Sequence, residues 1–406
     1  MIQPNLTADL CLKCNICTAA CPVAAATDLF PGPKAVGPQA ERYRHPRLPL
    51  PDASVMWCSA CGVCSRVCPH DVKVAEINTQ AKARLVEERG APLRDRLISN
   101  TELIGRLGTP LAPIANLSLR TRPVRWIMEK TIGIHREAPM PAYAGSTFRA
   151  RMRDYCVEKP PEQNDASRVT VAFFHGCSTN YYEHELGRIT IAVLEKLGCR
   201  VILPPQTCCG LAMQSNSLFE DARRQARQNV ALLLPFAEAG IPIVGTSTSC
   251  LLTMKYDYQA TLGLSGREVE LVAAQTFDVF EFMTTRLREA LDGLTFEPLA
   301  SRAIYHAPCK LRSHDVGIPT LPILRRIPQL EVTLSEAECC GGAGTYGMKR
   351  EKYDVARQVG SPLFEQAREW GANFIINESE TCRWWIAKHT QLSTLHPIEV
   401  LYRAMK

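Results

Sequence analysis

Two copies of one cysteine pattern constrain this chain more than any other feature of its sequence. The pattern is Cys-x2-Cys-x2-Cys-x3-Cys-Pro, and it occupies residues 11–22 and again residues 58–69. Three thiols on one tight loop can bind three corners of an iron–sulfur cubane, while the fourth points away from it. This is the spacing with which a pair of [4Fe-4S] clusters is bound. The sequence therefore predicts two such clusters and an electron-transfer function.

The position of the fourth cysteine predicts how the eight thiols are shared. In two-cluster ferredoxins this cysteine binds the cluster of the other run. One expected ligand set is therefore Cys11, Cys14, Cys17 and Cys68, and the other is Cys21, Cys58, Cys61 and Cys64. A pair of structural zinc sites is the alternative, but these usually combine two Cys-x2-Cys pairs or mix cysteine with histidine. The repeated proline favours iron–sulfur clusters.

The size and composition of the chain indicate a multidomain globular protein. With 406 residues, of which 46% are hydrophobic, two or three domains with ordinary cores are expected. Cluster binding requires free thiolates, and no charged and then apolar signal segment opens the sequence, so the 18 cysteines indicate a reducing cytoplasm. The longest stretch without a charge, residues 201–219, contains prolines and polar residues, so no transmembrane helix is expected.

Positive charge is concentrated in one segment. Residues 106–153 contain nine basic and two acidic side chains, a net charge of +7, whereas the whole chain has +6. Apolar residues such as Leu107, Ile114 and Trp126 lie among these charges. Such a segment could bind an anionic membrane surface peripherally, or it could be a plain linker between domains. It carries no pattern of basic and aromatic residues typical of nucleic-acid binding.

The last 240 residues contain an internal repeat of cysteines. Cys177 precedes the pair Cys208-Cys209 by 31 residues, and Cys250 follows that pair after 41. Cys309 precedes the pair Cys339-Cys340 by 30 residues, and Cys382 follows after 42. The two copies predict two related domains.

Hydrophobic patterns predict alternating strands and helices around these cysteines. Expected strands lie at residues 169–174, 200–203, 242–245, 303–306, 330–334 and 373–376. Expected helices lie at residues 72–89, 189–197, 219–239 and 351–370. Such alternation indicates parallel sheets with right-handed crossovers, and sites in α/β sheets lie beyond the carboxyl ends of the strands. The expected fold is α/β, with an α-helical two-cluster module at the amino end.

The repeated Cys-Cys-Gly segments resemble a known family. Cysteine-rich CCG domains occur in heterodisulfide reductase subunits and in iron–sulfur subunits of glycolate, lactate and glycerol-3-phosphate dehydrogenases. The similarity is greatest to the anaerobic glycerol-3-phosphate dehydrogenase subunits and covers essentially the whole chain. It is carried by Pro31-Gly-Pro-Lys, Phe173-Phe-His-Gly-Cys177, Tyr305-His-Ala-Pro-Cys309, Cys339-Cys-Gly-Gly-Ala-Gly-Thr-Tyr-Gly347 and Glu380-Thr-Cys-Arg-Trp384.

The resemblance implies a function within a larger complex. It implies an iron–sulfur subunit that accepts electrons from a flavin-containing partner oxidising glycerol 3-phosphate and delivers them to membrane quinone, on the cytoplasmic face of the cell membrane. The alternatives are a subunit of a glycolate or lactate oxidase-type complex, or a heterodisulfide-reductase-like subunit with its own chemistry. A carboxyl-terminal half that only anchors the cluster module is a further alternative.

The same resemblance implies an iron–sulfur centre in each CCG domain. The expected ligands are Cys177, Cys208, Cys209 and Cys250 in the first and Cys309, Cys339, Cys340 and Cys382 in the second. The family's fifth cysteine is replaced by Ser247 and Ser379, which puts the non-cubane cluster of heterodisulfide reductase in doubt. Either serine could offer an oxygen ligand. His175 and His306 could bind a cofactor or relay protons, although structural hydrogen bonding is the simpler interpretation.

The expected organisation has four parts. A two-cluster module spans residues 1–92, a basic amphipathic segment spans residues 93–167, and two CCG domains span residues 168–297 and 298–406. Residues 342–347 match Gly-x-Gly-x-x-Gly, but this match follows a cysteine pair instead of opening a βαβ unit. We therefore expect no NAD or flavin on this chain, and substrate oxidation is expected in partner chains.

Overall fold

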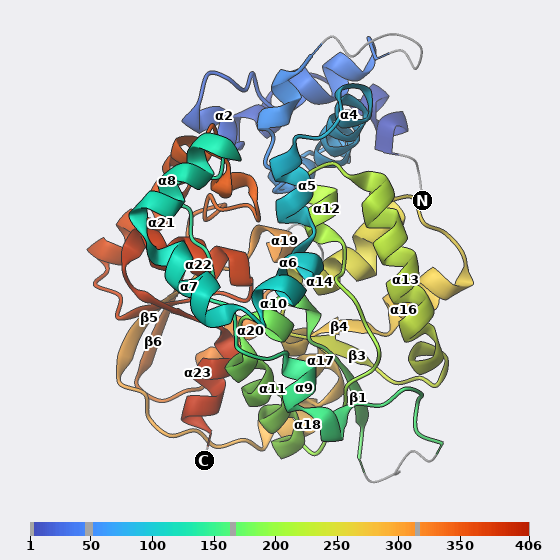
Figure 1. Cartoon of the computed structure of the whole chain (residues 1–406), viewed down its shortest axis with the longest axis vertical. Helices are drawn as coiled ribbons and strands as arrows, with labels where there is room; N and C mark the ends of the chain where they lie inside the picture. Colours follow the sequence, from blue (N-terminus) through green and yellow to red (C-terminus); the bar gives the residue numbers. More distant parts are fainter. Residues whose placement is uncertain (1–3, 45–51, 163–167, 313–316, 406) are drawn as a thin grey trace.

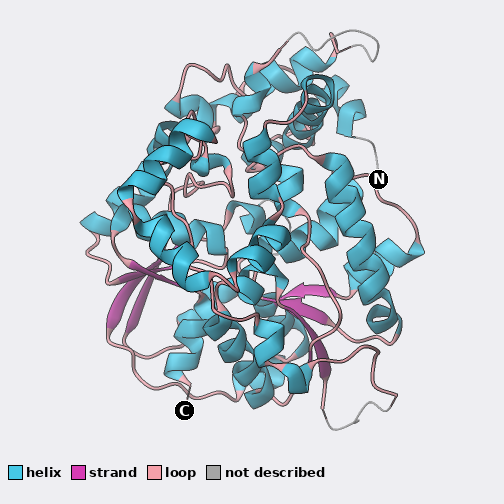
Figure 2. Ribbon diagram, viewed as in Figure 1, coloured by secondary structure: helices cyan, strands magenta, loops and turns pink. Residues whose placement is uncertain are grey.

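The computed structural model describes residues 4–44, 52–162, 168–312 and 317–405. A helical amino-terminal part lies at one end of the molecule, and two parallel sheets lie side by side toward the other end (Figure 1, Figure 2). A chain of helices, coloured cyan to green in Figure 1, runs between these parts along one face. The α/β fold with an α-helical amino-terminal module is confirmed.

The amino-terminal part is built from short helices around the two cysteine runs. These are η1 Pro4–Leu10, α1 Ile16–Ala19, α2 Pro22–Ala26, η2 Ala35–Gln39, η3 Ser54–Trp57, α3 Val63–Arg66 and α4 Val74–Arg89. The predicted helix before Gly90 is α4, and Gly90 ends it with a φ of 80°. Both cysteine loops enter their helix through a left-handed residue, Asn15 before α1 and Gly62 before α3. The two runs therefore fold alike.

The basic segment forms a series of short helices. These are α5 Leu93–Ser99, α6 Thr101–Gly108, α7 Ala112–Arg120, α8 Arg122–Thr131 and α9 Phe148–Arg151, followed by η4 Arg153–Tyr155. Prolines stand in the first turn of α7 and of α8, where a missing N–H costs nothing. The Asn100 side chain accepts a hydrogen bond from Leu103 N (3.2 Å) and so caps α6. These prolines and the Asn100 cap mark helix starts, and they divide the segment into short helices.

The first sheet has the strand order β2-β1-β3-β4, with every pair parallel. Its strands are β1 Thr170–Phe174, β2 Arg200–Ile202, β3 Ile243–Gly245 and β4 Thr276–Asp278. Its helices are α10 Gly176–Tyr181, α11 His184–Lys196, α12 Leu211–Ser215, α13 Phe219–Glu238, α14 Thr248–Leu252, η5 Thr253–Asp257, α15 Tyr258–Ala260, α16 Arg267–Ala274, α17 Val279–Arg286 and α18 Arg288–Asp292. The three predicted strands are confirmed, whereas β4 is an additional edge strand.

The second sheet repeats this plan with the order β6-β5-β7-β8, again entirely parallel. Its strands are β5 Ser301–Tyr305, β6 Leu330–Leu334, β7 Phe374–Ile376 and β8 Ser393–Leu395. Its helices are α19 Cys309–Arg312, α20 Thr320–Leu324, η6 Tyr346–Met348, α21 Tyr353–Glu369, α22 Glu380–Thr390 and α23 Pro397–Ala404. The sequence repeat is thus a repeat of topology.

One hydrophobic core joins the two sheets. It contains Val171 and Leu194 of the first half together with Ile323, Ile398 and Leu401 of the second. His396 also lies at this junction, where its Nε2 is 3.0 Å from the carbonyl oxygen of Thr246. Because side chains of both halves fill this core, the two domains pack directly against each other. Within the described residues, no helix combines the length and the apolar character that crossing a membrane requires.

Candidate functional site

The first predicted set of thiols surrounds one small cavity near the surface. Cys11, Cys14, Cys17 and Cys68 all line it, together with Lys34 and His70. Cys14 is exposed, Cys11 and Cys68 are partly exposed, and Cys17 is buried. The fourth cysteine of the second run is therefore brought beside the first run. The structure groups these thiols as the sequence predicts, and cluster binding by them stays a prediction.

The second set lies deeper in the molecule. Cys21, Cys58, Cys61 and Cys64 line a separate small cavity. Backbone N–H groups approach two of these thiols, because Ala24 N donates to Cys21 Sγ (3.5 Å) and Ala60 N donates to Cys58 Sγ (3.4 Å). Burial raises the pKa of the Cys21 thiol to about 11. A bound metal cluster would instead favour the thiolate.

In the first CCG domain, three separate loops bring four cysteines together. Cys177 lies on α10, Cys208 and Cys209 precede α12, and Cys250 lies on α14. The sulfur atoms of Cys209 and Cys250 are 3.0 Å apart. Hydrogen bonds from the thiols of Cys177 and Cys209 hold the pKa of Cys208 well below its usual range. The loops follow strands β1, β2 and β3, so the site lies beyond their carboxyl ends, as predicted.

The second CCG domain repeats this arrangement. Cys309 begins α19, Cys339 and Cys340 follow β6, and Cys382 lies on α22. Hydrogen bonds from Cys309 and Cys340 hold the pKa of Cys339 well below its usual range. Cys339 is thus the equivalent of Cys208. In each domain, hydrogen bonds from neighbouring thiols lower the pKa of the first thiol of the pair.

The backbone conformation explains why a glycine follows each cysteine pair. Gly210 has a φ of 84° and Gly341 a φ of 90°, values that L-residues rarely adopt. The turn lets the Gly210 N–H donate to Cys208 Sγ (3.5 Å) and the Gly341 N–H donate to Cys339 Sγ (3.3 Å). Gly341 also lies against α21, where an added Cβ would be 1.9 Å from the carbonyl oxygen of Ala356.

The two serines lie at the junction of the CCG domains. Ser247 Oγ donates to a carboxylate oxygen of Glu380 at 2.9 Å, and Ser249 Oγ lies 3.5 Å from Ser379 Oγ. The residues that replace the family's fifth cysteine therefore make contacts across the two domains. An oxygen ligand from Ser247 or Ser379 stays a prediction.

The two histidines are buried behind the cysteines. His175 Nδ1 is 2.8 Å from the carbonyl oxygen of Gly176, and His306 Nδ1 is 3.2 Å from Ser335 Oγ. Burial lowers the pKa of each imidazole to about 4. Neither histidine is among the residues lining the cavity between the CCG domains. In the described part of the chain, the Nε2 atoms of both rings have no hydrogen-bond partner. The burial of both rings and their absence from the cavity lining favour a structural role.

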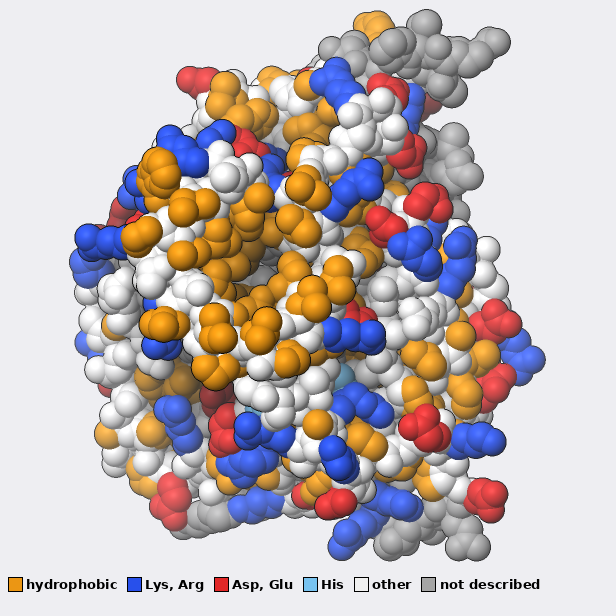
Figure 3. Space-filling model, viewed as in Figure 1, with side chains coloured by type: hydrophobic (Ala, Val, Ile, Leu, Met, Phe, Trp, Pro, Cys, Tyr) orange, Lys and Arg blue, Asp and Glu red, His pale blue; other side chains and the backbone are white. Residues whose placement is uncertain are grey.

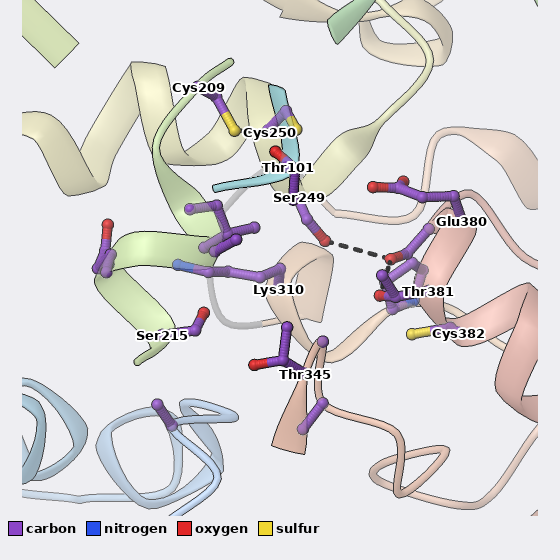
Figure 4. A pocket seen from close by; sticks show the side chains of 18 of the residues that line it. Thr101, Cys209, Ser215, Ser249, Cys250, Lys310, Thr345, Glu380, Thr381 and Cys382 are labelled. Carbon is purple, nitrogen blue, oxygen red and sulfur yellow. Dashed lines mark hydrogen bonds between the residues drawn. The ribbon is translucent and has the colours of Figure 1, made fainter. Parts of the chain in front are cut away.

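A cavity of about 270 Å³ lies between the two CCG domains. Cys209 and Cys250 lie on one wall and Cys382 on the opposite wall, and Ser249 points across the space (Figure 4). Cys61 of the amino-terminal part also lines this cavity, as do Ile98 and Ile104 of α5 and α6. Three parts of the chain that are distant in sequence therefore meet at one space.

Sequence reasoning missed several residues of this site. Thr101 of α6 donates a hydrogen bond to Cys208 Sγ at 3.3 Å, across 107 positions of sequence. Glu183 accepts hydrogen bonds from Arg383 (2.6 Å) and from Trp384 Nε1 (3.1 Å), which fixes the indole at the cavity. No local pattern marks Thr101 or Glu183, because their roles depend on packing between distant elements.

The donor sets fit iron–sulfur clusters. Each of the four sets consists of four free thiols, and thiolates are the ligands that such clusters use. Among the described residues, no three histidine, cysteine or carboxylate side chains are placed to hold one metal ion. In the two amino-terminal sets the thiols instead stand around a small space.

The inner set, Cys21, Cys58, Cys61 and Cys64, lies next to cysteines of the second CCG domain. Cys21 and Cys58 share one hydrophobic cluster with Cys339 of the second CCG domain. Burial, and then the nearby Cys339 thiol, raise the pKa of Cys61. Cys61 and Cys309 also line the same cavity. The amino-terminal module therefore contacts the second CCG domain through its inner cysteine set.

Comparison with known proteins defines the class of this protein. A cysteine-rich domain family, named CCG, matches residues 171–255 and 303–387. A 4Fe-4S dicluster domain family matches residues 7–72. The chain is an iron–sulfur protein with a dicluster module and two CCG domains, and these families favour iron–sulfur clusters over the zinc alternative.

A full-length relative narrows the class to a family. The chain is 36% identical over 400 residues to a subunit of the anaerobic glycerol-3-phosphate dehydrogenase of Escherichia coli K12, covering 97% of this chain and 98% of the relative. The chain belongs to the family of that dehydrogenase subunit.

More distant relatives share most of the chain. One is a subunit of the fumarate reductase (CoM/CoB) of Methanothermobacter marburgensis, which is 24% identical, covering 96% of this chain and 70% of the relative. Another is a subunit of the dihydromethanophenazine:CoB–CoM heterodisulfide reductase of Methanosarcina acetivorans, which is 22% identical, covering 93% of this chain and 90% of the relative.

Proposed function

We propose that this chain takes electrons from a flavin-containing partner subunit that oxidises glycerol 3-phosphate and delivers them to a membrane quinone. The donor substrate is suggested by the relative from Escherichia coli, which is a subunit of an anaerobic glycerol-3-phosphate dehydrogenase. Bound iron–sulfur clusters would supply one-electron carriers. The chain's own contribution is to hold these carriers in series and to present the last of them to an acceptor.

The observation that carries this proposal is the serial arrangement of the four cysteine sets. The first set, Cys11, Cys14, Cys17 and Cys68, is called the outer set because Cys14 is exposed. It is accessible to a partner protein. The inner set contacts the second CCG domain through Cys339, and the second CCG domain shares a cavity with Cys209 of the first. A series from a surface site to an internal cavity is suited to moving electrons between a protein partner and a small acceptor.

The surroundings of the cavity support a lipid-soluble acceptor. Nine large apolar side chains of residues 93–131, the segment that contains α5–α8, are between 39% and 69% exposed: Leu93, Leu97, Leu103, Leu107, Leu111, Ile114, Leu117, Trp126 and Ile127. Figure 3 shows hydrophobic side chains gathered around a hollow on the face where these helices lie. Ile98 and Ile104 of the same helices line the cavity. A quinone dissolved in a bilayer could enter from this apolar face.

This face also supports peripheral attachment to a membrane, and we propose that the chain binds the cytoplasmic side. The exposed side chains of Arg106, Arg120, Arg122 and Lys130 accompany the apolar ones and suit an anionic lipid surface. Arg125, one of the nine basic residues of the segment, does not belong to this lipid-facing set, because it is buried at 7% exposure. Its guanidinium donates to the carbonyl oxygens of Arg136 (2.9 Å) and His135 (3.1 Å), so it holds a loop instead of binding lipid.

Two cysteine variants test the proposal in the complex of this chain with its dehydrogenase partners. Cys209→Ser and Cys340→Ser should each abolish glycerol-3-phosphate-dependent reduction of a short-chain quinone, while a redox dye is still reduced. About eight iron and eight sulfide should remain on the two amino-terminal sets. Cys199→Ser, at a buried thiol outside all four sets, is the matched control. Unchanged quinone reduction in both test variants would assign these cysteines a structural role.

A second candidate is a reductase that acts on its own substrate within the cavity. The favouring observation is that CCG thiols of both domains face one space, in a chain related to a heterodisulfide reductase subunit. Electrochemically reduced chain, free of partners, should then reduce a mixed disulfide. Under the first proposal it reduces a quinone and leaves the disulfide intact.

A further inference from the structure

Three lysines are buried where the amino-terminal module meets the second CCG domain. Lys82 of α4, Lys349 and Lys352 are 5–6% exposed. All three line one small polar cavity, and Met56, Cys58 and Ser59 line it as well. Buried lysines are rare unless they are paired, because an ammonium loses its hydration on burial.

The carboxylates nearby do not balance these charges. Lys349 forms an ion pair with Asp95 at 2.7 Å, and Arg94 pairs with Asp95 and Glu351 at 2.8 Å each. Four cations therefore face two carboxylates. Within the described ranges, neither Lys82 nor Lys352 has a carboxylate partner within 4.0 Å.

The unpaired ammonium groups are bound to the loop that carries Cys58. Lys82 Nζ donates to the carbonyl oxygen of Cys58 at 3.1 Å. Lys352 Nζ donates to the carbonyl oxygen of Met56 and lies 4.7 Å from the ring centroid of Tyr346. One lysine comes from the amino-terminal module and the other from the second CCG domain. Both are thus fixed beside the inner cysteine set.

We propose that Lys82 and Lys352 raise the reduction potential of the cluster bound by Cys21, Cys58, Cys61 and Cys64. Reduction adds one negative charge to the cluster, so a fixed positive charge nearby stabilises the reduced form more than the oxidised form. Four ligating thiolates also supply the negative charge that this pocket lacks. The inference depends on a cluster at this set, and it is independent of the electron donor and acceptor.

The outer and inner sets differ in their exposure to water. Cys14 is exposed, so water can stabilise the added charge there, whereas Cys21, Cys58 and Cys64 are buried. Burial alone would make the inner cluster harder to reduce than the outer one. The two lysines offset this penalty and favour electron movement from the surface toward the interior.

A redox titration of the full chain, reconstituted with iron and sulfide and followed by EPR, tests the proposal. Lys82→Met and Lys352→Met should each disfavour reduction of one cluster at least tenfold, which for one electron is a fall of about 59 mV. Lys82→Arg and Lys352→Arg keep the charge and should restore most of the potential. Lys73→Met removes an exposed lysine of the same module and should leave every potential in place.

Two results would overturn the inference. One is that both methionine variants, with full iron content, keep all potentials within the change seen for Lys73→Met. The other is that both methionine variants lose the iron of the inner set. In that case the lysines would be required to build the site and not to set its potential.

Discussion

Replacing Gly341 by alanine should destabilise the chain more than the same change at the equivalent Gly210. Both glycines follow a cysteine pair and have positive φ, 90° and 84°. At Gly341 an added Cβ would be 1.9 Å from Ala356 O and 2.9 Å from Gly360 N, both backbone atoms of α21. At Gly210 the nearest atom, Ala222 O, would be 3.3 Å away.

The expected magnitudes follow from two separate costs. A left-handed conformation costs an L-residue about 1–2 kcal/mol, and Gly198→Ala isolates this cost because its φ is 83° and nothing lies within 4 Å of its Cβ. Forcing an extra carbon into a packed region adds about 1–3 kcal/mol. We therefore expect a loss of about 1–2 kcal/mol for Gly198→Ala and Gly210→Ala, and of about 2–5 kcal/mol for Gly341→Ala.

Anaerobic urea unfolding of the three variants, followed by tryptophan fluorescence, measures these differences. Iron content should fall in Gly341→Ala, because the turn that directs an N–H to Cys339 Sγ must move. Gly198→Ala should keep its iron. A Gly341→Ala protein as stable as Gly198→Ala would refute the argument, since the close approach to α21 would then have no energetic consequence.

Two further predictions concern pH and the membrane. Burial raises the pKa of Glu378 to about 7, above the unfolded value, so its contribution to stability is complete below about pH 4.5 and is lost as the pH rises through 7. Glu378→Gln should therefore gain on the wild type by up to about 1.4 kcal/mol per pH unit over this window in urea unfolding, and a constant difference from pH 5 to pH 8 would contradict this assignment. Replacing Leu107, Ile114 and Leu117 by glutamine should weaken binding to anionic vesicles at least about tenfold. Adding Arg120→Glu and Arg122→Glu should weaken this binding further. The control Leu12→Gln, at an exposed leucine of the amino-terminal part, should leave vesicle binding unchanged. Salt alone should then release only part of the protein, and binding that is unchanged in the glutamine variant would place the attachment elsewhere.

Local sequence determined the elements and the grouping of most thiols. The spacing of the two cysteine runs places Cys68 beside the first run and Cys21 beside the second, because each run makes the same tight loop and its fourth cysteine lies beyond a short turn. The three strands predicted in each CCG domain are present, because buried parallel strands form continuous apolar runs. The edge strands β4 and β8 were not predicted, because each contains a single apolar residue, Phe277 in β4 and Leu395 in β8, and so forms no apolar run.

Only the tertiary structure decided what surrounds these thiols. Arg120 and Arg125 are both basic residues of one amphipathic segment, yet one is exposed and the other holds three backbone carbonyl oxygens. Thr101 and Lys352 reach cysteine sites from elements that are distant in sequence, and Lys82 reaches the Cys58 loop from α4 of the same module. Spacing along a chain fixes which residues share a loop or a face, because the backbone periodicity is local. Which loop meets which helix depends on how apolar faces are buried together, and this packing involves residues from the whole chain.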